Sequence, residues 1–101
     1  MRVAIIYRPK SPAPLEAIPA LMQAMAAWVE KYGNRISPLE FFAAGGGYGV
    51  IDVDDSAELH RILAEHPFTP YADVEIRPVL SPAAAMENLR EAFAARTAAA
   101  S

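Results

Sequence analysis

Three side chains in this sequence have the chemistry for proton transfer beside a small-molecule pocket: Glu40, His66 and Asp73. Removing a proton next to a carbonyl group needs a carboxylate or an imidazole whose pKa is tuned by an apolar pocket. Glu40 lies between Leu39 and Phe41 on a predicted strand, which makes it one candidate. The alternative is that Glu40 points outward from an edge strand, where charges discourage aggregation.

The two histidines bracket a predicted helix over residues 55–65. His60 lies opposite the apolar stripe of this helix, so we expect it to face solvent. His66 lies at the helix C-terminus, where the helix dipole favours a cation, and a capping role therefore competes with a catalytic one. A metal site would need carboxylates from elsewhere in the chain, and no ligand spacing supports one. We expect neither a metal nor a cofactor.

Tyrosines and other aromatic residues are the predicted walls of a pocket. Tyr48 and Tyr71 can donate hydrogen bonds to a bound carbonyl group, or they can be core residues whose hydroxyls are satisfied. Asp73, Glu75 and Arg77 share one face of the last strand, where they either line a cavity mouth or pair across a subunit interface. The pocket residues predicted between sheet and helices are Tyr7, Phe41, Tyr48, His66, Tyr71 and Asp73.

Composition limits the function classes. The chain has 101 residues, which suits one domain, and its 53% hydrophobic content is high for that size. We therefore expect part of its apolar surface to be buried between subunits. A net charge of −3 with scattered Lys and Arg argues against nucleic-acid binding, and the lack of cysteine excludes thiol chemistry. With no signal-peptide pattern and no membrane-length apolar run, we expect a cytoplasmic protein without a membrane partner.

The elements that must position these side chains follow from the apolar patterns. Strands are predicted over 2–7, 36–42, 48–53 and 74–77. A first helix is expected from Ile18, with Pro19 in its first turn and an apolar stripe formed by Leu15, Ile18, Met22, Met25, Val29 and Tyr32. The helix over 55–65 begins with Asp55 as cap and Glu58 in capping-box spacing. A last helix begins at Ser81-Pro82, with a stripe formed by Met86, Leu89 and Phe93.

This order, βαββαβ with a terminal helix, predicts an α+β fold of the ferredoxin-like type. The first and third strands are apolar on both faces and should be central, whereas Pro38 places the second strand at an edge. Two helices cover only one face of the sheet. The other face, with Val50 and either Ile5 or Ile6, is expected to be covered by a second subunit, in a dimer or a higher ring. We expect one domain over residues 1–96 and a frayed tail over 97–101.

The second half of the chain resembles the muconolactone isomerase family. That family has a Leu-His pair in the second helix, matched by Leu59-His60, and a Pro-Tyr-x-Asp-x-Glu run into the last strand, matched by Pro70 to Glu75. The strand from Tyr48 to Val53 also fits. The resemblance implies the fold of the dimeric α+β barrel proteins and a homo-oligomer. The glycine turn and the terminal helix resemble small bacterial relatives of that group more closely.

In that family the acid-base site includes a carboxylate on the first helix and a Tyr and an Asn near the third strand, so the resemblance implies such groups at the matching positions. An ungapped alignment through Gly33 puts Met22 at the carboxylate position and Gly45–Gly47 at the polar pair, while Tyr48 matches the family's strand tyrosine. One hypothesis is therefore an enzyme, either an isomerase acting by proton transfer on a lactone or small carbonyl compound, or a relative of cofactor-free oxygenases. The other is a non-catalytic oligomeric binding or assembly module. A carboxylate or histidine in an enclosed cavity favours the enzyme hypothesis. If Met22, Met25 and Phe41 fill the space between sheet and helices, the enzyme would have no room for a substrate.

Overall fold

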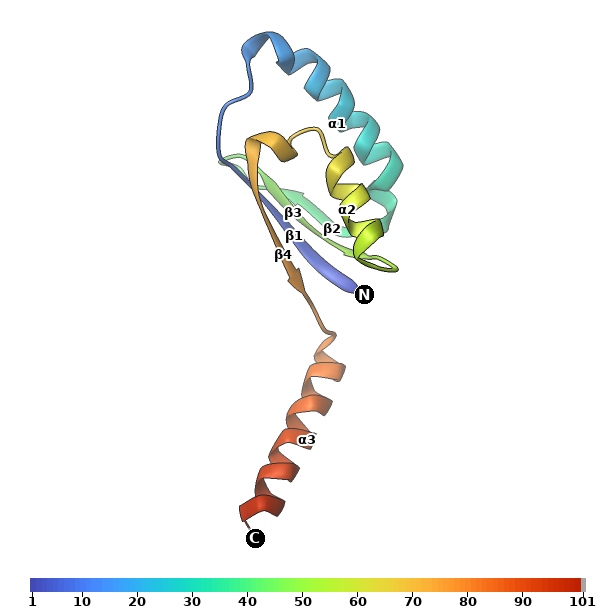
Figure 1. Cartoon of the computed structure of the whole chain (residues 1–101), viewed down its shortest axis with the longest axis vertical. Coiled ribbons are helices and arrows are strands. Elements are labelled where there is room, and N and C mark those ends of the chain that lie inside the picture. The colour runs from blue at the N-terminus through green and yellow to red at the C-terminus, as the bar shows by residue number, and fades with distance from the viewer. Residues whose placement is uncertain (101) are drawn as a thin grey trace.

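The computed structural model describes residues 1–100 and consists of a four-stranded antiparallel sheet with two helices on one face (Figure 1). The order βαββαβ with a terminal helix confirms the predicted ferredoxin-like α+β fold. Short 3-10 turns lie at Leu15–Ala17, Gly33–Arg35 and Thr69–Tyr71. The elements are β1 Arg2–Pro9, α1 Ile18–Tyr32, β2 Ile36–Phe41, β3 Gly47–Asp52, α2 Ser56–Glu65, β4 Ala72–Pro78 and α3 Pro82–Ala100.

The strand order is β2-β3-β1-β4, so the first and third strands are central as predicted. Pro38 lies on the edge strand β2, where its missing N–H costs no ladder hydrogen bond. The pairing of β2 with β3 is irregular between Ile36 and Leu39, on either side of this proline. The sequence pattern therefore predicted both the centre and one edge of the sheet correctly.

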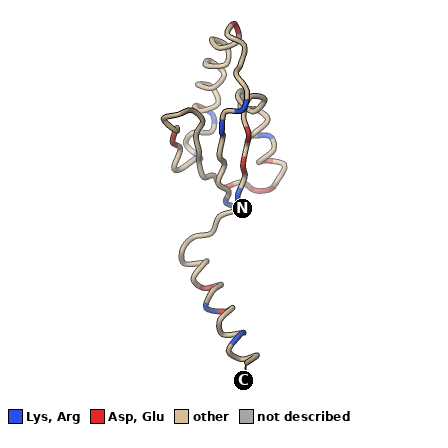
Figure 2. Tube along the Cα trace, turned by 90° about the vertical axis from the view of Figure 1, so that its left-hand side faces the viewer, with Lys and Arg blue, Asp and Glu red and all other residues tan. Residues whose placement is uncertain are grey.

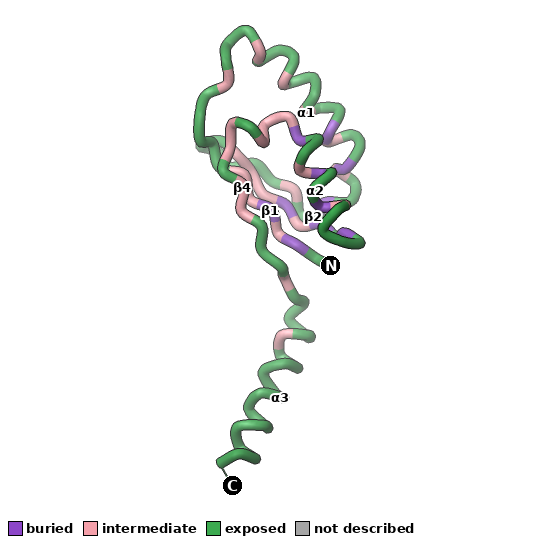
Figure 3. Tube along the Cα trace, viewed as in Figure 1, coloured by how far each residue is buried: buried purple, intermediate pink, exposed green. Residues whose placement is uncertain are grey.

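The hydrophobic core lies between the sheet and the two helices. Trp28 connects the two helices across this core, because the Trp28 Nε1–H donates to the Ile62 carbonyl oxygen at 3.0 Å and so links α1 to α2. Asp55 caps α2 as predicted, with its Oδ1 accepting from the Glu58 amide at 2.9 Å. The buried apolar residues are Val3, Ile5, Trp28, Tyr32, Ile36, Ile51, Val53, Leu59 and Ile62 (Figure 3).

Only the C-terminal half of α1 is packed into this core. Trp28 and Tyr32 are buried, whereas Ile18 and Met22 are exposed, Met22 to 59%. The first half of the predicted stripe therefore faces the cavity, which Ile18, Met22 and Met25 line, and not the core. The physical reason is that this half of α1 lies above an open cavity, where no core side chains are present to cover it.

Helix α3 extends away from the rest of the molecule (Figure 1), which measures 68 × 24 × 23 Å. All of its described residues except Ala85 are exposed. It begins as predicted, with the Ser81 hydroxyl accepting from the Ala84 amide at 3.1 Å. The helix continues through Ala100, so the described part of the expected tail is helical, and Ser101 lies outside the described residues. Among the described residues, no helix is long and apolar enough to span a membrane.

The sheet face opposite the helices has an apolar centre and a charged border. Because side chains alternate along a strand, Ala4, Ile6 and Val50 belong to this open face, while Ile5 and Ile51 are in the core. On the same face, Arg8 Nη1 pairs with Glu75 Oε2 at 2.8 Å. Figure 2 shows acidic and basic positions close together on this part of the sheet. We call this surface the open sheet face.

Gly46, in the turn between β2 and β3, provides a test of this fold. It has φ +80°, and a Cβ there would lie 2.1 Å from the Tyr7 carbonyl oxygen. We expect Gly46→Ala to lower the free energy of unfolding by more than about 1 kcal/mol, measured by urea denaturation. Gly33→Ala is the matched control, because Gly33 has φ −56° and the added Cβ would meet only the Val29 side chain, at 3.2 Å. Equal losses in the two variants would contradict the turn geometry.

Candidate functional site

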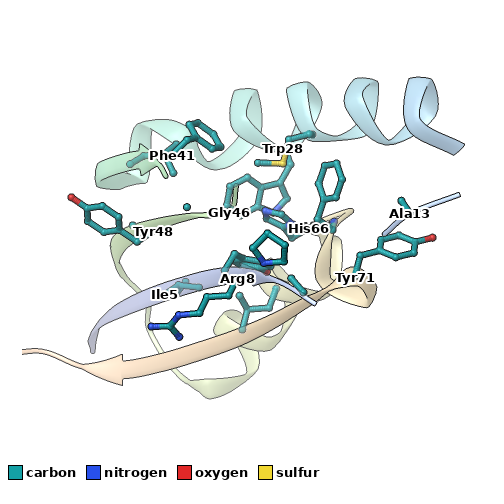
Figure 4. A pocket seen from close by; sticks show the side chains of 18 of the residues that line it. Ile5, Arg8, Ala13, Trp28, Phe41, Gly46, Tyr48, His66 and Tyr71 are labelled. Atoms are coloured by element: carbon teal, nitrogen blue, oxygen red, sulfur yellow. Dashed lines mark hydrogen bonds between the residues drawn. The ribbon is translucent and has the colours of Figure 1, made fainter. Parts of the chain in front are cut away.

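A cavity of about 460 Å³ lies between the sheet and the N-terminal half of α1 (Figure 4). It is mainly apolar, with walls from β1, α1, β2 and the segment that joins α2 to β4. None of its lining residues is an aspartate or a glutamate. The side chains that matter for its chemistry are Tyr7, Trp28, Leu63, His66, Phe68 and Tyr71.

The structure brings most of the predicted pocket residues together. Tyr7, Phe41, Tyr48, His66 and Tyr71 all line the cavity. The hydroxyl of Tyr48 points away from it (Figure 4) and donates to Glu40 Oε1 at 2.5 Å. The Met22, Met25 and Phe41 side chains leave the cavity unfilled, and Phe41 is 65% exposed.

The two candidate carboxylates lie outside the cavity. Glu40 is exposed on the edge strand β2, bonded to Tyr48 as described above. Asp73 is exposed on β4, with its Oδ1 3.9 Å from Lys10 Nζ. Strand alternation explains both positions, because the neighbouring residues Phe41 and Ala72 line the cavity and the carboxylates therefore point to the opposite face. The structure thus places Asp73 away from the pocket that it was predicted to line.

His66 is the buried polar residue of the site, with only 7% of its surface exposed. Its ring stacks on Tyr7, with centroids 4.1 Å apart, and meets Trp28 edge-on at 4.7 Å. Desolvation by these aromatic neighbours lowers the pKa of His66 to about 4. His66 is the C-cap residue of α2, and its amide donates to the Leu63 carbonyl oxygen at 3.2 Å. The expected cationic role is wrong, because burial outweighs the helix dipole and the imidazole is neutral near pH 7.

The hydrogen bonds of His66 fix which ring nitrogen carries its proton. Nδ1 accepts from the Phe68 amide at 3.1 Å, so the proton of the neutral ring is on Nε2. Among the described residues, Nε2 has no hydrogen-bond partner. Every side-chain nitrogen or oxygen atom of the described residues that is fully shielded from solvent does have a partner. Nε2 is therefore accessible. Because His66 lines the cavity, we infer that its Nε2–H is a donor available to a bound molecule.

Tyr7 is held in place by Thr69. The Tyr7 hydroxyl lies 3.0 Å from Thr69 Oγ1, which itself donates to the Leu63 carbonyl oxygen at 2.7 Å. Since the single hydroxyl proton of Thr69 is used in that bond, Tyr7 is the donor to Thr69. Burial raises the pKa of Tyr7, so its hydroxyl stays protonated. Tyr7 therefore serves as a fixed wall beneath His66.

The state of His66 disfavours metal binding. A ligating histidine needs one bare ring nitrogen and usually donates from the other, whereas here Nδ1 accepts a hydrogen bond and Nε2 carries the proton. The described residues also contain no cluster of three His, Asp or Glu side chains that could hold a metal ion. The arrangement fits hydrogen bonding to an oxygen atom of a mainly apolar ligand.

The sequence interpretation missed two residues of the site. Trp28 contacts both His66 and α2, and its signal was present, since Met25, Trp28 and Tyr32 follow helical three- and four-residue spacing. Thr69 positions Tyr7, but a single threonine next to a proline gives no signal of that role.

Comparisons with known proteins agree with the fold. A family model described as a domain of unknown function, DUF3303, matches residues 5–93. No curated protein matches the chain. A crystal structure of muconolactone isomerase is 22% identical, with a TM-score of 0.68, over 81% of this chain and 92% of that one. The 5-chloro-2-hydroxyhydroquinone dehydrochlorinase of Burkholderia phenoliruptrix AC1100, in complex with 2,5-dihydroxybenzoquinone, is 19% identical, with a TM-score of 0.57, over 77% and 93%. These likenesses confirm a muconolactone isomerase-like fold.

The burial of His66 predicts how stability depends on pH. Its pKa is about 4 in the folded chain and about 6.5 when unfolded, so between these values the unfolded state binds more protons. Stability from this group is complete above pH 6.5 and is lost as pH falls towards 4. We expect the free energy of unfolding to drop by roughly 2 kcal/mol from pH 6.5 to 5, measured by urea denaturation. His66→Asn should flatten this slope, whereas His60→Asn, at an exposed site on α2, should keep it. An unchanged slope in His66→Asn would contradict the assignment.

Proposed function

The chain belongs to the DUF3303 family, and we propose that it binds a small, largely apolar ring compound whose oxygen accepts a hydrogen bond from His66. The observation that carries this proposal is a neutral histidine in a mainly apolar cavity, with its Nδ1 occupied by the Phe68 amide. Such a cavity selects its ligand by shape and apolar contact, and the Nε2–H donor of His66 orients it.

The size and charge of the cavity support a neutral ligand. A volume of about 460 Å³ falls within the range of small-molecule pockets. Arg8 is the cationic residue of the lining, but its guanidinium lies on the open sheet face, where it is paired with Glu75 at 2.8 Å. No carboxylate lines the walls, so neither an anion nor a cation finds a free partner there. A lactone, a quinone or an aromatic carbonyl compound matches these properties.

Isomerisation by proton transfer on a lactone or small carbonyl compound is the second candidate function. A neutral imidazole N–H can stabilise the oxygen of an enolate that forms next to a carbonyl group. The two solved structures point to related compounds, since one is named for a lactone and the other was solved with a dihydroxybenzoquinone. The base would have to come from outside the described cavity walls, because they hold no carboxylate. Binding is therefore the better supported part of this function.

Homo-oligomerisation through the open sheet face is part of the proposal. Its apolar centre, formed by Ala4, Ile6 and Val50, is bordered by the Arg8–Glu75 pair. A second copy related by twofold symmetry would cover the same patch on both chains. The assembly module without a ligand is less well supported, since such a module has no need for an unfilled cavity with a free donor.

Two substitutions of His66 distinguish the contributions of its two ring nitrogens to ligand binding. Asparagine keeps an acceptor near the Nδ1 position and loses the Nε2 donor, whereas glutamine places an amide N–H near the Nε2 position. With coumarin and 1,4-naphthoquinone as neutral probes, we expect His66→Asn to lower affinity about tenfold, the worth of one hydrogen bond, as measured by calorimetry. His66→Gln should stay within about threefold of the unsubstituted chain.

His60→Asn is the matched control, because His60 is exposed on α2 and should leave affinity unchanged. Two results would contradict the proposed function. One is that neither probe binds at millimolar concentration, nor any other compound in a panel of neutral lactones and quinones. The other is that a probe binds equally well to the His66→Asn and His66→Gln variants.

A further inference from the structure

Large exposed apolar side chains gather at two opposite ends of the molecule. One group, the rim patch, borders the cavity and consists of Ile18, Met22 and Phe41. The other, the arm strip, lies on α3 and consists of Met86, Leu89 and Phe93. Figures 1 and 3 show α3 leaving the sheet at the end away from the loop that precedes α1. Each patch leaves apolar surface in water that a partner could cover.

The arm strip lies far from the rim patch of its own chain (Figure 1). The Val79 amide donates to the Arg2 carbonyl oxygen at 3.0 Å, which extends the β1–β4 ladder beyond Pro78. The Ser81 hydroxyl then caps α3 at the Ala84 amide. Leu80 alone separates these two hydrogen-bonded residues, so the connection from β4 to α3 is short. The rim patch lies at the opposite end of that strand.

We propose that the arm strip of a second copy packs on the rim patch and closes the cavity. The occupant is another copy of this chain because both surfaces are apolar, both are on every copy, and they lie at opposite ends of one molecule. A twofold arrangement satisfies both pairs at once, with each arm on its partner's rim. The proposal rests on the proposed function in one respect, since the arm would form the remaining wall of the same ligand site.

The available area is adequate for such an exchange. Helix α3 has 19 residues and is therefore about 28 Å long. A strip about 10 Å wide along two exchanged helices, together with the surfaces that receive them, would bury about 1,100 Å², just above the roughly 1,000 Å² that a specific interface needs. An isolated helix of this length is only marginally stable in water, so packing would also stabilise α3 itself. Contact between the open sheet faces would add to this area.

A chain without cysteine allows the contact to be tested directly by cross-linking. Met22→Cys and Leu89→Cys chains with different affinity tags are co-expressed and treated with a short bis-maleimide. Both positions are more than half exposed, so neither change disturbs the core. We expect a mixed product that links position 22 of one chain to position 89 of the other. The matched control replaces Leu89→Cys by Asn88→Cys, at an exposed position on the same helix but off the arm strip, and should give little product.

The outcomes separate this inference from the ligand proposal, because cross-linking needs no ligand. A 22–89 product that exceeds the 22–88 product supports the exchanged arm. Equal products from both pairs would overturn it, and so would a monomer in light scattering. A dimer without the 22–89 product would overturn it as well, since the open sheet faces alone would then hold the copies together. Failure of coumarin or naphthoquinone to bind would leave a positive cross-link intact and would count only against the ligand site.

Discussion

The indole of Trp28 is the contact on which both the core and the cavity depend. Its N–H bonds the Ile62 carbonyl oxygen and so joins α1 to α2, while its ring edge meets His66. Towards the C-terminus of α1 the helix is packed, with Tyr32 buried in the core. Towards the N-terminus it leaves the sheet, and the cavity opens beneath Met22 and Met25. Trp28 therefore lies at the boundary between the hydrophobic core and the cavity.

The chemistry of the site follows from the competition between burial and charge at His66. A helix C-terminus stabilises an imidazolium by about 2 kcal/mol at most, whereas removing the charge from water costs more when the ring lies between Tyr7 and Trp28. The ring is therefore neutral, and the Phe68 amide then selects its tautomer. A neutral donor in apolar surroundings favours an oxygen of a neutral ligand over a metal or a charged group. The proposed ligand class rests on this sequence of causes.

Much of the fold could be predicted from local patterns because each pattern has one dominant cause. Pro38 lacks an amide proton, which marks the edge strand, and Asp55 accepts from the Glu58 amide, which marks a helix start. The site was harder to predict, since it depends on which face of a strand a residue occupies and on how deeply it is buried. A shift of one residue separates Asp73 from the cavity-lining Ala72. The burial of His66 comes from Tyr7 and Trp28, which are distant in sequence and could not be placed beside it from the pattern alone.

The proposed ligand binding depends most directly on His66 being a neutral donor that is protonated at Nε2 and lines the cavity. Long-range ¹⁵N–¹H correlation spectra of the ¹⁵N-labelled full chain at pH 7 report the tautomer of each imidazole directly. We expect one histidine to have a protonated Nε2 and a bare Nδ1, and its Nε2–H signal to shift when coumarin is added while the His60 signals stay in place. An imidazolium or an Nδ1-protonated ring at His66 at this pH would contradict it.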